Sequence, residues 1–311
     1  MKSTKYISID KDIIQENAVF EFNLFIPSEQ EKKMHYFKHA GTLVTAKDVQ
    51  KLKNIKAVYI NETERAYYLR YYNQRVKHTQ KKYINFEDKA AEIYHKATVI
   101  LHALFSNPED LETYNASKRV INEFVETVVD RNFTIESIIN IAEHDYSIMT
   151  HSINVCIYAL NVGTYLKFSK EMLEALGEAA LLHDIGKSKI NPEIVGKKGR
   201  LTAIEFTEMK KYPMFGYSIG LKLGIQNRDI LMGIKYHQER MDGSGYPSGL
   251  RGEYIPIVAR IIAVCDVFDA LTSKRTYKEA MGVFEALLLM KTKMSKQLDV
   301  KILNKMIEML R

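Results

Sequence analysis

The order of hydrophobic and polar positions separates an amino-terminal segment of mixed periodicity from a long remainder with helical periodicity. In the first segment, the apolar runs 18–26 and 57–60 are typical of β-strands, and the residues after Thr45 and after Asn61 follow a helical pattern. This mixture predicts a small α/β domain over residues 1–85.

The remainder has the pattern of helices separated by loops. A break at Ser106-Asn107-Pro108 predicts a turn between two helices. Farther along, Thr202 opens a capping-box sequence, and Pro256 precedes a helix expected over 257–271. We therefore predict an α+β protein overall, in which residues 86–311 form a helical connector and an all-α domain.

Composition narrows the class of protein without changing this picture. With 311 residues, 46% of them hydrophobic, the chain can bury a large core. No apolar run is long enough to span a bilayer and no leader-like segment follows Met1, so we expect a soluble cytoplasmic protein without membrane contact. Cys156 and Cys265 form no CxxC pattern and are expected in the core.

The net charge by itself would suit an anionic ligand, but the distribution of charges indicates an ordinary surface. The net charge is +7, yet the lysines are scattered among glutamates, as on an ordinary solvated surface. The chain has no arginine-rich tail and no stripe of alternating basic and aromatic residues. We therefore expect no nucleic-acid polymer among its partners.

Polar residues interrupt several of the apolar runs that predict buried helices. Five of them stand out: His151, His183, Asp184, Asp266 and Asp269. Burying such groups costs free energy unless each has a partner, and a metal ion is one partner that several could share. Each residue taken alone would more often be a hydrogen-bonded core residue.

Read together, four of these residues give the order H…HD…D: His151, His183, Asp184 and Asp266. A mixed imidazole and carboxylate set suits divalent Fe, Mn, Zn or Mg. This order resembles the HD superfamily of metal-dependent phosphohydrolases. The sequence HQERMDGSGYP, residues 237–247, is similar to the HHExxDGxGYP motif of the HD-GYP family of cyclic di-GMP phosphodiesterases. Further similar segments are 199–202, 253–256 and 266–273, so the resemblance covers about residues 145–311.

The resemblance implies an HD-type helical bundle with a divalent metal centre of one or two ions. Fe or Mn are the metals expected first, with Zn, Mg and Ni as alternatives. The implied ligands of the first ion are His151, His183, Asp184 and Asp266. Asp184 would bridge to a second ion that His237 also binds.

The resemblance also implies a binding cleft for cyclic di-GMP beside the metals. Asp184 and Lys187 would be the catalytic residues. The positions implied near the substrate are Lys187, Asp269, Arg275, Lys278, Gly243 and Tyr246. Independently of any family, the Asp-Gly-Ser-Gly sequence 242–245 predicts a shaped loop, because glycine permits positive φ and close backbone approach. An ordinary surface turn is the alternative.

Three positions depart from the family pattern, and all three concern metal ligands. Gln238 and Tyr212 stand where the family has histidines, and Ser147 stands where some members have a glutamate. The serine argues against a third ion. A second ion would have to use water or the oxygens of Gln238 or Tyr212, which predicts weak binding. Compensation by Glu143, His144 or Asp145 is a remote alternative.

Two functions of different classes follow. As an enzyme, the protein would use metal-activated water to cut cyclic di-GMP to linear pGpG, with the metal and Lys187 stabilising the developing charge. As a weak or inactive member, it would be a cyclic di-GMP receptor, or a scaffold that binds diguanylate cyclases or other signalling proteins through the GYP loop. Another HD-type phosphohydrolase is a third reading. The amino-terminal domain either regulates the second domain or supports a homodimer.

Overall fold

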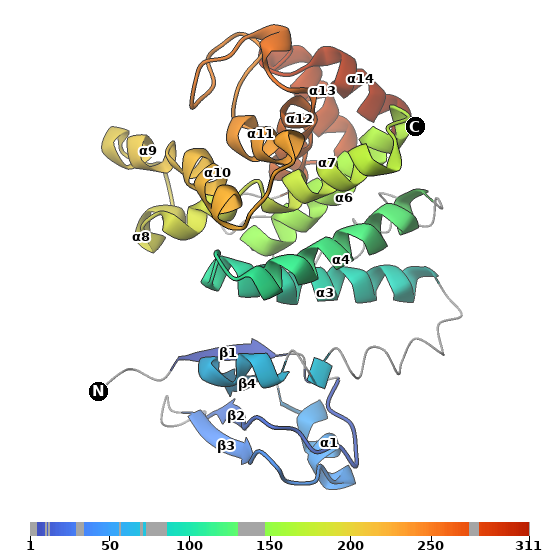
Figure 1. The fold of residues 1–311 in the computed structure, drawn as a ribbon, viewed down its shortest axis with the longest axis vertical. Coiled ribbons are helices and arrows are strands. Elements are labelled where there is room, and N and C mark those ends of the chain that lie inside the picture. The colour runs from blue at the N-terminus through green and yellow to red at the C-terminus, as the bar shows by residue number, and fades with distance from the viewer. Residues whose placement is uncertain are drawn as a thin grey trace. The chain divides into compact units, whose positions relative to one another are not determined.

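The computed structural model describes residues 5–9, 11, 13–28, 34–55, 57–68, 71–72, 86–129, 147–273 and 280–310. The chain folds into two compact units, Met1–Ile84 and Asn85–Arg311 (Figure 1). The first unit contains a four-stranded antiparallel sheet, and the described part of the second is built from helices and loops. The predicted α+β class is confirmed.

The sheet of the first unit has the strand order β1-β4-β2-β3. Its strands are β1 (Tyr6–Ile9), β2 (Leu24–Pro27), β3 (Met34–Lys38) and β4 (Val58–Asn61). The predicted strand at 57–60 is therefore present as β4. Of the run 18–26, only the end enters the sheet: Ala18, Phe20 and Phe22 are buried in alternation, yet residues 18–23 lie outside the named strands. The alternating burial of residues 18–22 therefore belongs to a core segment that precedes the strand and is not itself part of the sheet.

The helical patterns of the first unit begin where the sequence predicts. Thr45 caps α1 (Ala46–Lys53) in a capping box with Asp48. Asn61 caps the short 3₁₀ helix η1 (Glu62–Glu64). Each cap accepts a hydrogen bond from a backbone N–H that the helix itself leaves unsatisfied.

The second unit begins with two long helices that pack against each other, α3 (Phe86–Ser106) and α4 (Leu111–Val129) (Figure 1). The predicted turn at 106–108 separates them. Their packed neighbours are the central pair α6 (Ile148–Tyr165) and α7 (Lys170–Leu182). Every position of α6 from His151 to Leu160 is buried, so this helix lies inside the core rather than on its surface.

Two further helices pack against the central pair: α11 (Arg228–Tyr236) contacts α7, and α12 (Ile257–Thr272) contacts α6. Pro256 precedes α12, as predicted. The remaining elements are η2 (Ile185–Lys189), α8 (Pro192–Val195), α9 (Ala203–Met209), α10 (Tyr212–Lys222), η3 (Gly252–Tyr254), α13 (Val283–Lys293) and α14 (Val300–Met309). Thr202 forms the predicted capping box at α9.

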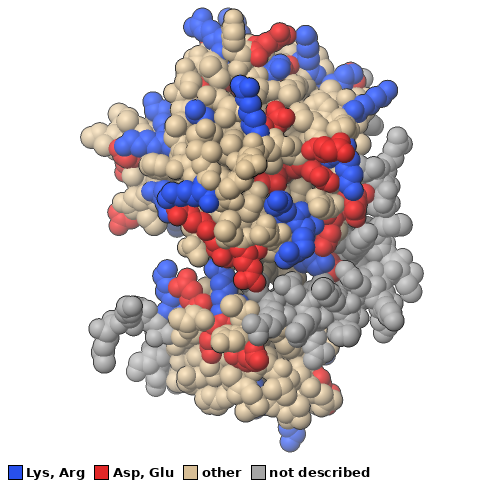
Figure 2. Space-filling view, viewed as in Figure 1, with Lys and Arg blue, Asp and Glu red and all other residues tan. Residues whose placement is uncertain are grey.

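Both cysteines are buried and unpaired in the helical core, as expected. None of the helices in the described ranges is long and apolar enough to cross a membrane. Figure 2 shows basic and acidic side chains next to one another on the visible face of the helical unit. That distribution fits the solvated surface expected from the sequence.

Candidate metal centre

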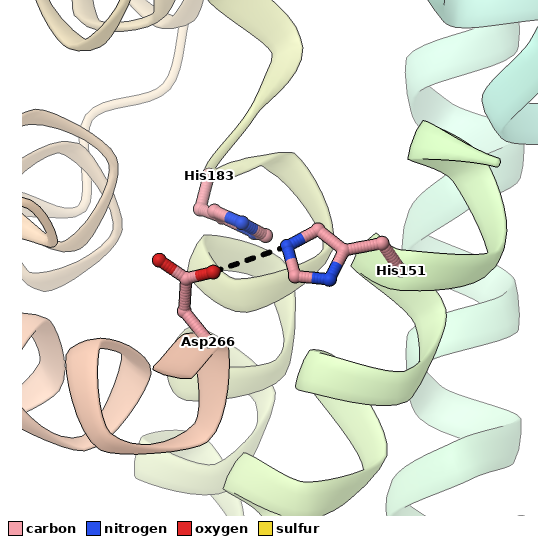
Figure 3. A group of neighbouring side chains, drawn as sticks. All are labelled: His151, His183 and Asp266. Carbon is pink, nitrogen blue, oxygen red and sulfur yellow. Dashed lines mark ion pairs between the residues drawn. The ribbon is translucent and has the colours of Figure 1, made fainter. Parts of the chain in front are cut away.

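Three helices bring His151, His183 and Asp266 together. His151 lies in the first turn of α6, His183 follows the last residue of α7, and Asp266 lies on α12. Figure 3 shows the three side chains pointing toward one another. One ligand atom from each lies within 4.8 Å of the others, and the His151 Nε2 to Asp266 Oδ1 distance is 3.2 Å.

Backbone and carboxylate acceptors fix which nitrogen of each histidine faces the centre. His183 donates its Nδ1–H to the Ala180 carbonyl at 2.7 Å, so its Nε2 carries the lone pair. His151 donates its Nδ1–H to Asp269 Oδ2 at 2.6 Å. Both rings thus present Nε2 to the centre in the arrangement usual for metal-binding histidines.

Two buried atoms of the centre have no hydrogen-bond partner within the described ranges: His183 Nε2 and Asp184 Oδ1. They lie 3.6 Å apart. Leaving an imidazole lone pair and a carboxylate oxygen unsatisfied inside a protein is costly, and a cation would satisfy both at once. The donor set therefore fits a divalent metal ion.

The second oxygen of Asp184 accepts a hydrogen bond from Lys187 Nζ at 2.5 Å. Burial by itself would raise the pKa of Asp184, but the positive charge of Lys187 holds it well below its ordinary value. The Lys187 side chain is 23% exposed, whereas Asp184 is buried. Lys187 is thus a cation with solvent access beside a buried carboxylate.

The charge state of His151 reflects its two carboxylate neighbours. Burial opposes a charged ring, but hydrogen bonds to Asp266 and Asp269 raise the pKa of His151 to about 9. The two carboxylates thus favour the protonated ring. A bound cation would take the place of the Nε2 proton between His151 and Asp266.

A second group of possible ligands comprises His183, Asp184 and His237, again with ligand atoms within 4.8 Å of one another. His237 follows the last residue of α11 and donates Nδ1–H to the Ile234 carbonyl at 2.8 Å. Burial lowers the pKa of His237 to about 3, so its ring is neutral. Its Nε2 accepts a hydrogen bond from the Tyr212 hydroxyl at 2.6 Å.

The three residues that depart from the family pattern all have defined partners. Tyr212 bonds to His237, and Gln238 donates its side-chain N–H to Asp266 Oδ2 at 2.8 Å. Ser147 is the N-cap of α6 and accepts a hydrogen bond from the Thr150 backbone N–H. Its hydroxyl therefore serves the helix terminus.

Asp269, which the resemblance places near the substrate phosphates, lies behind His151 in the structure. It is fully buried, and its oxygens accept hydrogen bonds from His151, from Asn154 at 2.9 Å and from Ser273 at 3.0 Å. This geometry supports orientation of the His151 ring. Asn154 was not among the predicted residues, although a polar residue three positions after His151 on an apolar helix was an available signal.

The loop after His237 has the glycine geometry predicted for it. Gly243 has φ +80°, and a Cβ on Gly245 would lie 2.4 Å from the Arg240 backbone nitrogen. Glu239 was not among the predicted residues; it is buried and accepts hydrogen bonds from the backbone N–H groups of Ser248 at 2.7 Å and Leu250 at 3.0 Å. The loop is therefore tied to the end of α11.

Tyr246 on this loop lies near the centre. Its backbone N–H donates to the Gln238 carbonyl at 3.2 Å. Burial, with a further contribution from Asp266, raises the pKa of the Tyr246 phenol well above its ordinary value. The remaining predicted residues, Arg275 and Lys278, lie outside the described residues, as do Glu143, His144 and Asp145.

The profile of the HD domain family matches residues 134–302. One similar protein is the cyclic di-GMP phosphodiesterase response regulator RpfG of Xanthomonas campestris, 49% identical over 129 residues, which are 40% of this chain and 34% of that protein. Another is the cyclic di-GMP phosphodiesterase PA4108 of Pseudomonas aeruginosa, 33% identical over 177 residues, 57% of this chain and 42% of that protein. The chain thus matches less than half the length of either relative.

Among solved structures, the fold is similar to that of Bd1817, an HDG"Y"P protein from Bdellovibrio bacteriovorus. The TM-score is 0.72, and the alignment covers 98% of this chain and 99% of that one at 20% sequence identity. This likeness extends to the amino-terminal unit as well as the helical one.

Proposed function

The chain belongs to the HD domain family, and from this premise we propose that it is a metal-dependent phosphodiesterase that hydrolyses cyclic di-GMP to linear pGpG. One observation carries the proposal: the buried, unsatisfied pair His183 Nε2 and Asp184 Oδ1 lies beside His151 and Asp266. The names of RpfG and PA4108 support the choice of substrate.

The residues that would hold the ion are His151, His183, Asp184 and Asp266. A divalent cation bound there supplies a Lewis acid that makes water a better nucleophile and draws charge from the phosphodiester. Imidazole and carboxylate donors together favour Fe or Mn, with Zn, Mg and Ni as alternatives.

Lys187 supplies a positive charge that comes from the protein and not from the metal ion. Its ammonium group is held by Asp184 and remains partly open to solvent. From this position it can donate a hydrogen bond to a phosphate oxygen and stabilise the charge that develops during the reaction. We assign Asp184 and Lys187 as the catalytic residues.

Other residues position the reacting groups. Asp269 holds the His151 ring through Nδ1. Gly243 and Tyr246 belong to the loop beside the centre, and we assign this loop as a wall of the substrate cleft. Arg275 and Lys278 are proposed to bind the substrate phosphates on the strength of their sequence positions.

Hydrolysis by this route breaks one of the two equivalent phosphodiester bonds. The oxygen of water bonds to phosphorus, the bond from phosphorus to the ribose 3′ oxygen breaks, and that oxygen takes up a proton. The product keeps the cleaved phosphate at its 5′ end, which is linear pGpG.

A second candidate is a receptor that binds cyclic di-GMP without cutting it, or a scaffold for signalling proteins such as diguanylate cyclases. The observation that favours it is the hydrogen bond from Tyr212 to His237, which engages a nitrogen that a second ion would need. In that case the retained loop would serve binding alone.

The test compares the native chain with Asp184→Ala and with Asp229→Asn, a matched change at an exposed aspartate on α11. Protein purified without oxygen is loaded with Mn²⁺ or Fe²⁺, and bound metal and pGpG formation are measured. We expect Asp184→Ala to lose the metal and at least about a hundredfold in turnover, and Asp229→Asn to keep both. Nucleotide bound but uncut by the native chain would favour the receptor. Full metal content in Asp184→Ala would overturn the ligand assignment.

A further inference from the structure

We propose that the Tyr212 hydroxyl and the Gln238 amide take the place of a second metal ion, so that this chain holds a single divalent cation. The inference rests on the metal centre of the proposed function. Two groups of possible ligands share His183. One group adds His151 and Asp266, and the other adds Asp184 and His237. Hydrogen bonding distinguishes the two groups.

The four residues proposed to hold the single ion are His151, His183, Asp184 and Asp266, and two of their atoms are open to a cation. His183 Nε2 is buried and has no hydrogen-bond partner in the part of the chain that the structure describes, and the same is true of the adjacent Asp184 Oδ1. His151 Nε2 faces Asp266 Oδ1 at 3.2 Å, and these two residues would help to hold the ion. A single ion would thus satisfy both of the unpartnered atoms, His183 Nε2 and Asp184 Oδ1.

In the second group, the only nitrogen lone pair of the His237 ring already accepts a hydrogen bond. Its Nδ1–H donates to the Ile234 carbonyl, which leaves Nε2 as the acceptor, and the Tyr212 O–H donates to that nitrogen at 2.6 Å. Both side chains are buried, Tyr212 with only 2% exposure, so neither can turn away into solvent.

Gln238 cannot offer its oxygen to a second ion. Asp266 accepts hydrogen bonds, so the group facing Oδ2 at 2.8 Å must be the amide N–H of Gln238. The amide oxygen accepts from Arg240 Nη2 at 3.3 Å, and arginine can only donate. The two partners together fix the orientation of the amide, with a donor group toward the centre.

Backbone contacts hold Tyr212 in the position from which its hydroxyl bonds to His237. An ideal Cβ on Gly186 would lie 1.9 Å from the Tyr212 carbonyl oxygen, so the segment after Asp184 and the start of α10 are in direct backbone contact. Lys187 Nζ lies 4.9 Å from the centre of the Tyr212 ring. The phenol is therefore part of the rigid wall of the site.

The experiment counts ions in the full chain. Metal-free protein is incubated without oxygen in excess Mn²⁺ and desalted, then Mn is measured by elemental analysis and by electron paramagnetic resonance. We expect about one ion per chain with the spectrum of isolated Mn²⁺. The double variant Tyr212→His/Gln238→His should bind about two ions, magnetically coupled because paired sites lie about 4 Å apart. Tyr217→His, a matched change on α10 at a residue packed against the core and Lys235, should stay at about one.

Each outcome decides between distinct claims. About two ions in the native chain would overturn the single-ion proposal and leave the metal centre intact. No ion in the native chain or in either variant would overturn the metal centre and the proposed function with it. Circular dichroism establishes whether the double variant folds, and if it does not, the count and spectrum of the native chain decide the proposal.

Discussion

At the scale of single residues, Gly186 shows how the absence of a side chain shapes the site. It follows Asp184 by two positions, and a methyl group there would lie 1.9 Å from the Tyr212 carbonyl oxygen and 2.4 Å from the Gly216 nitrogen. Both neighbours are backbone atoms, which cannot rotate away. Gly186 therefore allows the close approach of α10 to the residues of the metal centre.

Gly186→Ala should lower the free energy of unfolding of the helical unit by about 3 kcal/mol, because the added methyl group forces two backbone segments apart. Urea unfolding measures the change, and chelator competition should show weaker metal binding. Gly282→Ala is the control, since a Cβ at that position meets nothing within 4 Å. Equal stability of the two variants would contradict the close packing described for Gly186.

Asp269 tests positioning at the same scale. Asp269→Asn keeps the size of the side chain but removes the charge that holds His151 through Nδ1. We expect metal affinity to fall about 10- to 100-fold, the usual effect of losing such a partner. Competition with a chelator measures the affinity, and Asp229→Asn again provides the control. Unchanged affinity would show that His151 needs no carboxylate behind it.

At the scale of elements, Asp48 joins α1 to the sheet. Its side chain completes the capping box with Thr45 and accepts a hydrogen bond from Lys38 on β3 at 2.6 Å. Burial opposes the charge, but the hydrogen bonds from Lys38 and Thr45 lower the pKa of Asp48 to about 2. This carboxylate therefore links the stability of the first unit to pH.

Because its folded-state pKa lies below the ordinary value, Asp48 stabilises the fold fully above about pH 4 and loses this contribution as the pH falls toward 2. Asp48→Asn should cost about 1 kcal/mol at pH 7 and little at pH 2. Urea unfolding of the full chain at a series of pH values measures the difference. Glu16→Gln, at an exposed acid of the same unit, is the matched control.

The elements also show how far the sequence predicts the molecule. Helix termini set by local chemistry, such as the caps at Thr45 and Thr202, were predictable because the cap and its partner lie within one turn. Which part of the run 18–26 forms a strand was not predictable, since strand pairing depends on a partner elsewhere in the chain. Similarly, the bonds of Tyr212 and Gln238 depend on how α10, α11 and α12 pack, and no local pattern specifies this.

At the scale of the whole molecule, the candidate centre belongs to one of the two units. Every described residue of the centre lies between His151 and Asp269, within the unit Asn85–Arg311. The candidate ligands come from α6, from the residues that follow α7 and from α12, which are distant in sequence and meet only when this unit is folded. Metal binding should therefore stabilise the folded helical unit by mass action.

Removing the metal with a chelator should lower the unfolding midpoint of the helical unit by roughly 5 to 10 °C, given about 2.7 kcal/mol of binding free energy at a hundredfold excess over the dissociation constant. Hydrogen exchange followed by mass spectrometry resolves the response by segment. Peptides from α6 and α12 should lose protection on chelation, while those from β2 and β4 should not.

Asp184→Ala should exchange like the chelated native chain whether or not metal is added, because its centre cannot retain the ion. Equal loss of protection in both units would mean that they unfold as one cooperative body, and no loss in either would mean that the centre contributes no binding energy to the fold.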